Sequence, residues 1–412
     1  MRPTLLPSRI APRTPRLIRV LCVLCVLAAA DSGRAQEPPA PQAVAPAQLT
    51  AAIDKLGDLD YATRTNASRL VRRAPASQAV PALMQAVSDH ADGYVRYRAL
   101  VLLTGFNDPR TRDSMREVLT SPNDRLRTVA YSYFEHNPDP SMLPQFVKAL
   151  DTEQGEFVRP ALVRGLAATV ASGSGAAVAQ ARELLVRDVT RGEDYFRSTV
   201  IEALGDYKAA YAYDAITGVA KLEGPLQDDA ALALGKIGDK RALETLAQLQ
   251  RTAPRAAQPS IAAAICLLDV NCSSHVNYLG DVLKFTEKNA GYQELLRGAA
   301  AGLGALGVAG HAEAAALLFD IGIPAKDDFL RAPVALALGT IALRNTPLML
   351  SLLEKDDHRD ASLSLLAEGF DMLEEDLDKE RFFALARRTY WESGDGSPRR
   401  ALMQTIIGKL DF

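Results

Sequence analysis

Aromatic residues are scarce in this 412-residue chain, at 6% of the total with a single Trp. Its five histidines are scattered, at positions 90, 136, 275, 311 and 358. No two of them have the spacing that puts paired imidazoles on one helix face, so the sequence predicts no metal site. Neither a G-x-S-x-G motif nor a P-loop occurs. The sequence therefore predicts no catalytic residues, no cofactor and no enzymatic activity.

No segment alternates convincingly between apolar and polar residues at period two, so we expect no β-sheet. Hydrophobic residues make up 48% of the chain and charged residues 24%. A chain of this length and composition can bury a sizeable core. These absences leave an all-α fold as the prediction.

Cysteine is also rare, with four residues in the chain. Cys266 and Cys272 lie in ICLLDVNCSS, where they bracket a predicted helix end and a turn. In an oxidising compartment they could form a local disulfide. The alternative is a buried thiol at Cys266 and a loop thiol at Cys272. The redox spacing C-x-x-C is absent, so a bond here would be a structural brace.

Residues 1–35 have the pattern of a secretory signal peptide. Five arginines precede the apolar run VLCVLCVLAAA, and DSGRA follows it. We expect cleavage after Ala35, with Gly33 two residues before it, and a periplasmic or secreted bacterial protein with no membrane insertion after cleavage. An uncleaved anchor, a lipoprotein and an organellar transit peptide are alternatives. Bulky residues before Cys22 and Cys25 disfavour lipidation, and the compact apolar run disfavours a transit peptide.

Residues 36–48, QEPPAPQAVAPAQ, are rich in Pro and Ala, which predicts an extended linker. Residues 49–412 form the third predicted segment, a continuous helical solenoid. Residues 1–35 carry six Arg and one Asp, so the remainder of the chain has a net charge of about −8 against −3 for the whole. An acidic chain is a poor match for a nucleic-acid backbone, so we expect no nucleic-acid partner.

An internal repeat organises the chain. An Arg or Gln, here called the anchor, is followed by apolar residues at positions +3 and +7. Nine anchors recur at Arg64, Arg96, Arg127, Arg159, Arg197, Gln227, Gln258, Arg297 and Arg331. Their spacings are 32, 31, 32, 38, 30, 31, 39 and 34 residues, the length of a two-helix repeat. All nine +3 residues and eight of the nine +7 residues are apolar, which predicts one buried helix stripe per copy.

A carboxylate precedes most anchors by three or four residues and is expected to cap the helix or complement its positive end. These carboxylates are Asp60, Asp92, Asp124, Glu156, Asp194, Glu223, Glu294 and Asp328. Because they recur with the repeat, a carboxylate close to an Arg indicates structure in most copies and not a catalytic pair.

The clearest copy is AALALGKIGDKRALETLAQL, Ala230–Leu249, which predicts a helix, a tight turn at GDK and a second helix. With its LGKIGD ending, Leu226–Leu249 resembles a HEAT-type repeat of the kind also found in phycobilisome lyases. The resemblance extends from about Ala51 to the C-terminus. It implies a right-handed α-α superhelical solenoid of about ten helix pairs. The resemblance says little about function, because such repeats serve many roles.

The resemblance also suggests a binding face, since the second helix of a HEAT-type pair usually lines the concave side. Tyr211 and Tyr213 begin such a helix and suit a contact surface, although ordinary inter-helix packing is the favoured interpretation of both. Acidic EEDLDKE, Glu374–Glu380, is expected to be a solvated helix face.

Three functions are consistent with these features. The first is an exported scaffold that binds a protein or peptide partner along its concave face. The second, from the resemblance alone, is a bilin-lyase type of enzyme, whose tetrapyrrole chemistry conflicts with an export signal. The third is an envelope spacer without a dedicated ligand.

Overall fold

The computed structural model describes residues 42–289 and 291–410, and the predicted signal peptide lies outside these residues. Contacts divide the chain into Met1–Glu37 and a second compact unit, Pro38–Phe412. In the described residues this second unit contains 22 α-helices and no strand. The prediction of an all-α solenoid is confirmed.

The first described helix begins inside the predicted linker. α2 spans Pro46–Asp54, with Pro46 in its first turn, where a missing N–H costs nothing. Before it, the Val44 N–H donates to Gln78 Oε1 at 3.0 Å, and Gln78 Nε2 donates back to the Val44 carbonyl at 3.1 Å. The linker prediction is therefore wrong for Pro46–Gln48, because a proline-rich segment also suits a helix start.

Each predicted anchor lies near the start of a helix that opens a helix pair. The nine pairs are α3 (Tyr61–Arg73) with α4 (Ala76–Asp89), α5 (Gly93–Thr104) with α6 (Thr111–Val118), α7 (Asp124–His136) with α8 (Leu143–Thr152), α9 (Val158–Ser172) with α10 (Ala176–Asp188), α11 (Asp194–Asp206) with α12 (Tyr213–Ala220), α13 (Gln227–Ile237) with α14 (Ala242–Thr252), α15 (Gln258–Leu267) with α16 (Cys272–Glu287), α17 (Gln293–Val308) with α18 (Ala312–Gly322), and α19 (Asp328–Arg344) with α20 (Thr346–Glu354). Short 3-10 turns, η1 (Lys55–Gly57), η2 (Pro140–Met142), η3 (Ala210–Ala212) and η4 (Arg255–Ala257), join some of them.

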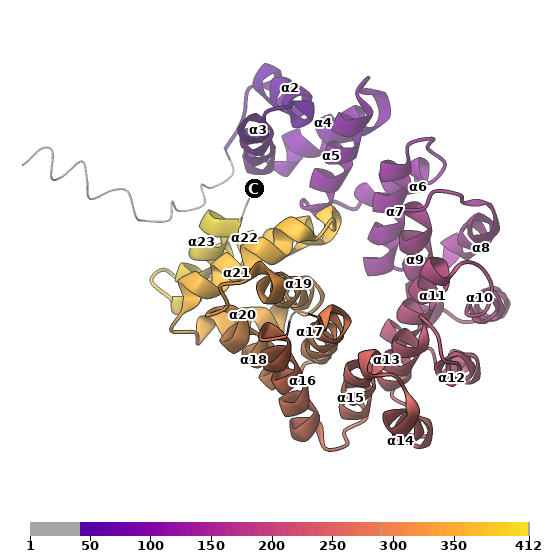
Figure 1. Ribbon diagram of the computed structural model, residues 1–412. Helices are drawn as coiled ribbons and strands as arrows, with labels where there is room; N and C mark the ends of the chain where they lie inside the picture. The colour runs from indigo at the N-terminus through magenta and orange to yellow at the C-terminus, as the bar shows by residue number, and fades with distance from the viewer. Residues whose placement is uncertain (1–41, 290, 411–412) are drawn as a thin grey trace, which may run out of the picture. The chain divides into compact units, whose positions relative to one another are not determined.

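The helix pairs follow one another along a curved path, called the arc below (Figure 1). The anchor helices form the inner row of this arc, and the second helices of the pairs form the outer row. Small residues on the anchor helices let the inner row pack tightly. A Cβ atom on Gly165 of α9 would lie 2.8 Å from the Tyr131 carbonyl of α7, and one on Gly205 of α11 would lie 2.9 Å from Ala233 Cα of α13. The expectation that second helices line the concave side is therefore wrong, because the helices that approach most closely occupy the shorter arc.

The anchor side chains have a common structural role. Arg96 Nε donates to the Val87 carbonyl at 2.7 Å, near the end of α4. Gln227 Nε2 donates to the Ala220 carbonyl at the end of α12, at 3.1 Å. The anchors at Arg197, Gln258 and Arg331 bond the ends of α10, α14 and α18 in the same way. Carbonyls in the last turn of a helix lack partners within it, so each of these anchors caps the preceding repeat.

A tenth copy, unlike the nine, has a polar +3 residue. Arg359 Nε donates to the Leu353 carbonyl at 2.9 Å and opens α21 (Arg359–Met372), and the +3 residue is buried Ser362. Two more helices follow, α22 (Asp376–Glu392) and α23 (Pro398–Leu410). The estimate of about ten repeats is thereby met.

Predicted carboxylate caps occur at some repeats. Asp60 and Asp92 are N-caps whose carboxylates accept the backbone N–H of Thr63 and Tyr94. In the α7 copy Asn123 takes this role and Asp124 stands one residue inside the helix. Glu156 and Glu223 lie before their helices without capping them. The acidic residue thus complements the helix start more often than it caps it.

Two hydrophobic clusters fill the unit. One extends from Leu49 to Leu268 and includes Leu377 of α22, and the other extends from Ala262 to Leu410. They meet on α15, which contributes to both. Among the described residues no single helix is both long and apolar enough to cross a membrane, and one pair, α19 and α20, passes the same test only with a 112° bend between its helices.

Candidate protein-interaction surface

The acidic stretch Glu374–Glu380 is not a solvated face, contrary to the prediction. It begins α22, which packs against α5 and α7 of the first repeats. Asp378 and Glu380 are only 5% and 2% exposed. We call this contact between α22 and α3, α5 and α7 the seam. Pattern alone could not reveal it, because the cationic partners stand about 240 to 310 residues earlier in the chain.

Glu380 makes the most buried contact of the seam. Its carboxylate accepts hydrogen bonds from Nε and Nη2 of Arg72 of α3, the shortest at 2.6 Å, and one from Arg387 Nη2 at 2.8 Å. Gly105, the residue after α5, leaves room for this group, since a Cβ atom there would overlap Glu380 Oε1. A buried charge is tolerated only with such complete pairing.

Asp376 and Asp378 continue the seam along α22. Tyr97 donates its hydroxyl to Asp376 Oδ2 at 2.5 Å, and Arg98 Nη1 donates to the same oxygen at 2.8 Å. Asp378 Oδ1 lies 2.6 Å from His136 Nε2 of α7. Carboxylates on α22 therefore face Arg, Tyr and His residues from three separate repeats.

Glu135 of α7 connects the inner row to α19. It accepts hydrogen bonds from Arg164 Nε at 2.9 Å, from Arg344 Nη1 at 2.8 Å and from the Tyr207 hydroxyl at 2.8 Å. Its side chain is 3% exposed. Arg344 is 209 residues away, so Glu135 joins the two ends of the arc as well as neighbouring repeats.

These pairings set the protonation of the seam. Burial raises the pKa of each carboxyl group, but the cationic partners outweigh it. Arg164 and Arg344 hold the pKa of Glu135 below its usual range, and Arg72 and Arg387 do the same for Glu380. The close approach of His136 and its charge, together with Arg344, leave the pKa of Asp378 at about 2 despite its burial. The seam is therefore an ionised contact at neutral pH.

Two clefts flank α22. One, of about 310 Å³, lies between α22 and the end of α5, and its lining includes Asn107, Asn137 and Arg388. The other, of about 230 Å³, is lined by residues of α3 and α5 that include Tyr61 and Tyr94. Because α22 occupies the inner surface of the first repeats, that part of the concave side is filled by the chain itself.

Tyr211 and Tyr213 lie on the outer row, so the prediction that they face the concave side is wrong. Tyr213 begins α12, is 8% exposed and stacks under the Arg241 guanidinium at 4.3 Å. Tyr211 belongs to η3, lies under Arg182 at 5.1 Å, and burial raises its pKa to about 12. Partner binding by these two residues stays a prediction.

Large exposed apolar side chains gather instead where the anchor helices begin. Of the eleven that the described residues hold, six lie within five residues before an anchor. They are Leu59, Tyr61, Phe157, Tyr195, Leu222 and Tyr292. Phe157 is 73% exposed, Tyr195 61% and Tyr61 59%, which for aromatic side chains is unusual without a partner.

Three of five successive anchor helices, α3, α9 and α11, begin with such a residue, and the two between them begin with half-buried Tyr94 and exposed Arg125. We call Tyr61, Tyr94, Arg125, Phe157 and Tyr195, from α3, α5, α7, α9 and α11, the aromatic edge. Arg125 lies 5.3 Å from the Tyr94 ring, and Arg159 lies 3.7 Å from the Phe196 ring, so the starts of neighbouring anchor helices are in contact. Helices pack roughly 8–10 Å apart, so the row is on the order of 40 Å long.

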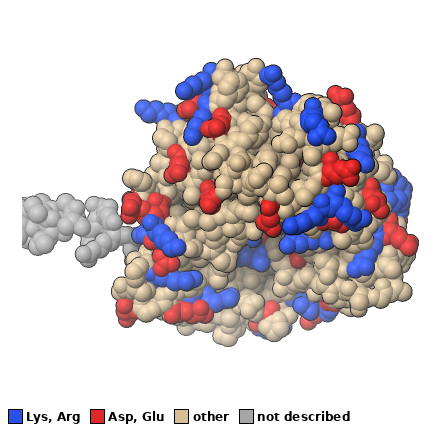
Figure 2. Space-filling model, turned by 90° about the horizontal axis from the view of Figure 1, so that it is seen from below, with Lys and Arg blue, Asp and Glu red and all other residues tan. Residues whose placement is uncertain are grey.

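The spacing of apolar residues around the anchors does not predict the aromatic edge, because no single repeat carries a distinctive aromatic motif. The signal is an aromatic residue two positions before the anchor at Tyr94, Phe157 and Tyr195, with Tyr61 one position earlier. Anchor alignment would have revealed it. On the face drawn in Figure 2, acidic and basic side chains are mixed and neither sign forms a continuous surface.

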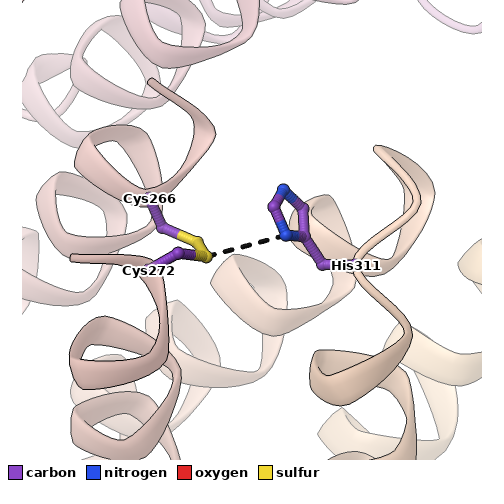
Figure 3. Close-up of a disulfide and its surroundings, with 3 residues drawn as sticks. All are labelled: Cys266, Cys272 and His311. Carbon is purple, nitrogen blue, oxygen red and sulfur yellow. Dashed lines mark hydrogen bonds between the residues drawn. A yellow bond between two sulfur atoms is a disulfide. The ribbon is translucent and has the colours of Figure 1, made fainter. Parts of the chain in front are cut away.

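Cys266 and Cys272 are joined by a disulfide, with their Cα atoms 4.2 Å apart. Figure 3 shows the His311 imidazole directed at this bond, and its Nδ1 atom lies 3.6 Å from Cys272 Sγ. The three residues come from two neighbouring repeats, and sequence spacing gave no sign of the histidine.

Comparison with known proteins identifies the repeats. Residues 49–133 and 80–167 match the family model of HEAT repeats, and residues 226–252 match that of the PBS lyase HEAT-like repeat. The second match covers Leu226–Leu249, the best copy in the sequence. No curated protein matches the chain significantly.

Several solved structures share the helical architecture. YibA of Escherichia coli is 15% identical over 55% of this chain and 82% of its own, with a TM-score of 0.39. The CpcE–CpcF complex of the Nostoc phycocyanin lyase is 20% identical over 55% and 88%, with a TM-score of 0.34. Yeast importin-beta is 12% identical over 84% of this chain and 53% of its own, with a TM-score of 0.39. At such values no function transfers, and what the comparisons establish is that this solenoid contains HEAT repeats.

Proposed function

We propose that this protein is an exported, non-catalytic scaffold that binds a protein partner along its aromatic edge. The observation that carries the proposal is the exposure of Tyr61, Phe157 and Tyr195 at the starts of α3, α9 and α11, of which the last two are adjacent anchor helices. Aromatic and Arg side chains dominate binding energy at protein interfaces. Burying one exposed aromatic side chain contributes about 1.5–3 kcal/mol, so several in one row suffice for a specific complex.

The proposed surface differs from the concave face expected from the repeats. The inner surface of α3, α5 and α7 already holds α22, and Tyr61 and Tyr94 line the cleft beside it, whereas Phe157 and Tyr195 are exposed and line neither of the two clefts. An extended segment covers about 3.3 Å per residue, so a stretch of roughly a dozen residues would span the row. A partner offering apolar side chains along such a stretch fits best.

The test is site-specific photo-crosslinking in the producing cells. A benzophenone amino acid at position 157 or 195 should capture the same single protein, because the two residues lie on adjacent anchor helices. Met372, which is 42% exposed at the end of α21, is the control position. Equal capture at all three positions, or none at any, would support the spacer alternative and refute the assignment.

Replacing Phe157 and Tyr195 together by Ser should weaken partner binding at least tenfold, which corresponds to about 1.4 kcal/mol. The melting temperature should not fall, because both side chains are exposed. Met372→Ser is the matched control and should leave binding unchanged. The same preparation tests export: the N-terminal residue of the envelope or secreted form should be Gln36.

A further inference from the structure

Three metal-binding side chains converge at the disulfide. Cys266 lies near the end of α15, Cys272 is the first residue of α16, and His311 is the N-cap of α18. Their two sulfur atoms and an imidazole nitrogen all lie within 4.8 Å of one another. Figure 3 shows that they reach this point from three separate elements. The aromatic edge does not involve these three residues, so a role for them is independent of the proposed function.

We propose that the reduced form of this site binds Zn²⁺ through the thiolates of Cys266 and Cys272 and Nδ1 of His311. Zinc takes thiolate and imidazole ligands at about 2.0–2.3 Å in tetrahedral geometry, which sets neighbouring ligand atoms roughly 3.5–4 Å apart. The 3.6 Å between Cys272 Sγ and His311 Nδ1 matches that separation. Cys266 is fully buried while Cys272 and His311 are partly exposed, so a water molecule completes the fourth position from the solvent side.

The disulfide and the metal exclude each other, because both use the same two sulfur atoms. Reduction of the bond by a dithiol, or by a phosphine and one water molecule, supplies two electrons and two protons and yields two thiols, while the dithiol becomes a disulfide or the phosphine becomes its oxide. Zn²⁺ then displaces the two thiol protons, which are released to solvent, and His311 binds as the neutral imidazole. Oxidation by a disulfide of another molecule reverses the sequence and expels the metal.

The position of the site gives the exchange a structural effect. The disulfide joins α15 to α16 within one repeat, whereas zinc would also hold the turn between α17 and α18 in the next repeat. α15, like α22, contributes residues to both hydrophobic clusters. Metal binding therefore braces the chain at the junction of its two cores, and it should raise the melting temperature of the reduced protein.

The experiment uses the full chain with Cys22 and Cys25 replaced by Ser, so that the N-terminal thiols do not compete. After reduction with a phosphine, Zn²⁺ is titrated against a chromophoric chelator. We expect one Zn²⁺ per reduced chain and none per oxidised chain. Co²⁺ in place of Zn²⁺ should give the absorption of a tetrahedral thiolate complex.

His311→Ala should weaken Zn²⁺ binding at least about tenfold, since loss of even an outer-shell partner costs 10–100-fold. His275→Ala, one turn into α16 from Cys272, is the matched control and should change nothing. The oxidised His311→Ala variant should melt like its parent, which verifies the fold. Absence of stoichiometric binding by the reduced parent, or equal effects of the two histidine variants, would overturn the zinc site and leave a disulfide brace.

Discussion

At the scale of single residues, the anchor explains why Arg and Gln share one position. Both carry a planar group with N–H donors on a long stem, and both reach a carbonyl at the end of the preceding helix. The charge of Arg adds an attraction to the negative end of that helix. The hydrogen bond is therefore the shared requirement, and the charge is an addition to it.

Arg96→Met should lower the free energy of unfolding by about 1–3 kcal/mol, because it keeps the aliphatic stem and removes the donor to the Val87 carbonyl. Arg96→Gln should lower the free energy of unfolding clearly less, because the native Gln anchors show that an amide can donate the same hydrogen bond. Urea denaturation followed by circular dichroism measures both. Equal losses for Met and Gln would mean that charge, and not capping, is what the position needs.

At the scale of elements, α22 has two kinds of surface. Its apolar side chains, such as Phe382 and Phe383, belong to the C-terminal cluster, while Asp376, Asp378 and Glu380 meet the first repeats. The helix is therefore fixed to the C-terminal repeats by apolar packing, and to the first repeats by ion pairs together with buried Leu377, which belongs to the N-terminal cluster. Each side should respond to a different perturbation.

Glu380→Ala should destabilise the protein by about 3–5 kcal/mol, because it leaves Arg72 buried without its carboxylate partner. Asp395→Ala removes an ion-pair partner that is 92% exposed and should cost almost nothing. Thermal melting of the two variants gives the comparison. If both variants melt at the same temperature, Glu380 does not contribute as its burial implies.

At the scale of the whole unit, the seam should open in acid. Asp378 has a folded pKa of about 2 against 3.8 for the free side chain, so its stabilisation is present above pH 3.8 and is lost as the pH falls towards 2. That shift corresponds to about 2 kcal/mol. The pKa values of Glu135, Asp376 and Glu380 are lowered too, so their stabilisation is also lost as the pH falls.

Small-angle scattering between pH 6 and pH 2.5 should therefore show the radius of gyration rising only below about pH 4, while helicity by circular dichroism persists further. Asp378→Asn should open at higher pH than the parent. A radius of gyration that stays constant until helicity is lost would show that the seam does not open before the helices unfold.

The sequence was sufficient to predict the repeats, but it did not predict the contact of α22 with the first repeats. Apolar spacing around each anchor is a local property of one helix, so nine helix pairs followed from it. The aromatic edge was visible in principle, at a fixed offset from the anchor for Tyr94, Phe157 and Tyr195. The seam and the approach of His311 to Cys272 depend on how repeats curve in space, which the spacing of residues within a helix does not encode.

Capping by the anchors also gives the array a direction. Arg96, Arg197, Gln227, Gln258 and Arg331 each complete the helix end of the repeat before them, so those repeats lack one of their stabilising bonds until the next repeat has begun to form. During synthesis on the ribosome the N-terminal repeats emerge first. A helix pair that is capped in this way is therefore incomplete until the first turn of the next repeat has formed. Shortening the protein from its C-terminus should thus expose an uncapped helix at each step, whereas shortening it from the N-terminus leaves a spare cap and no open end.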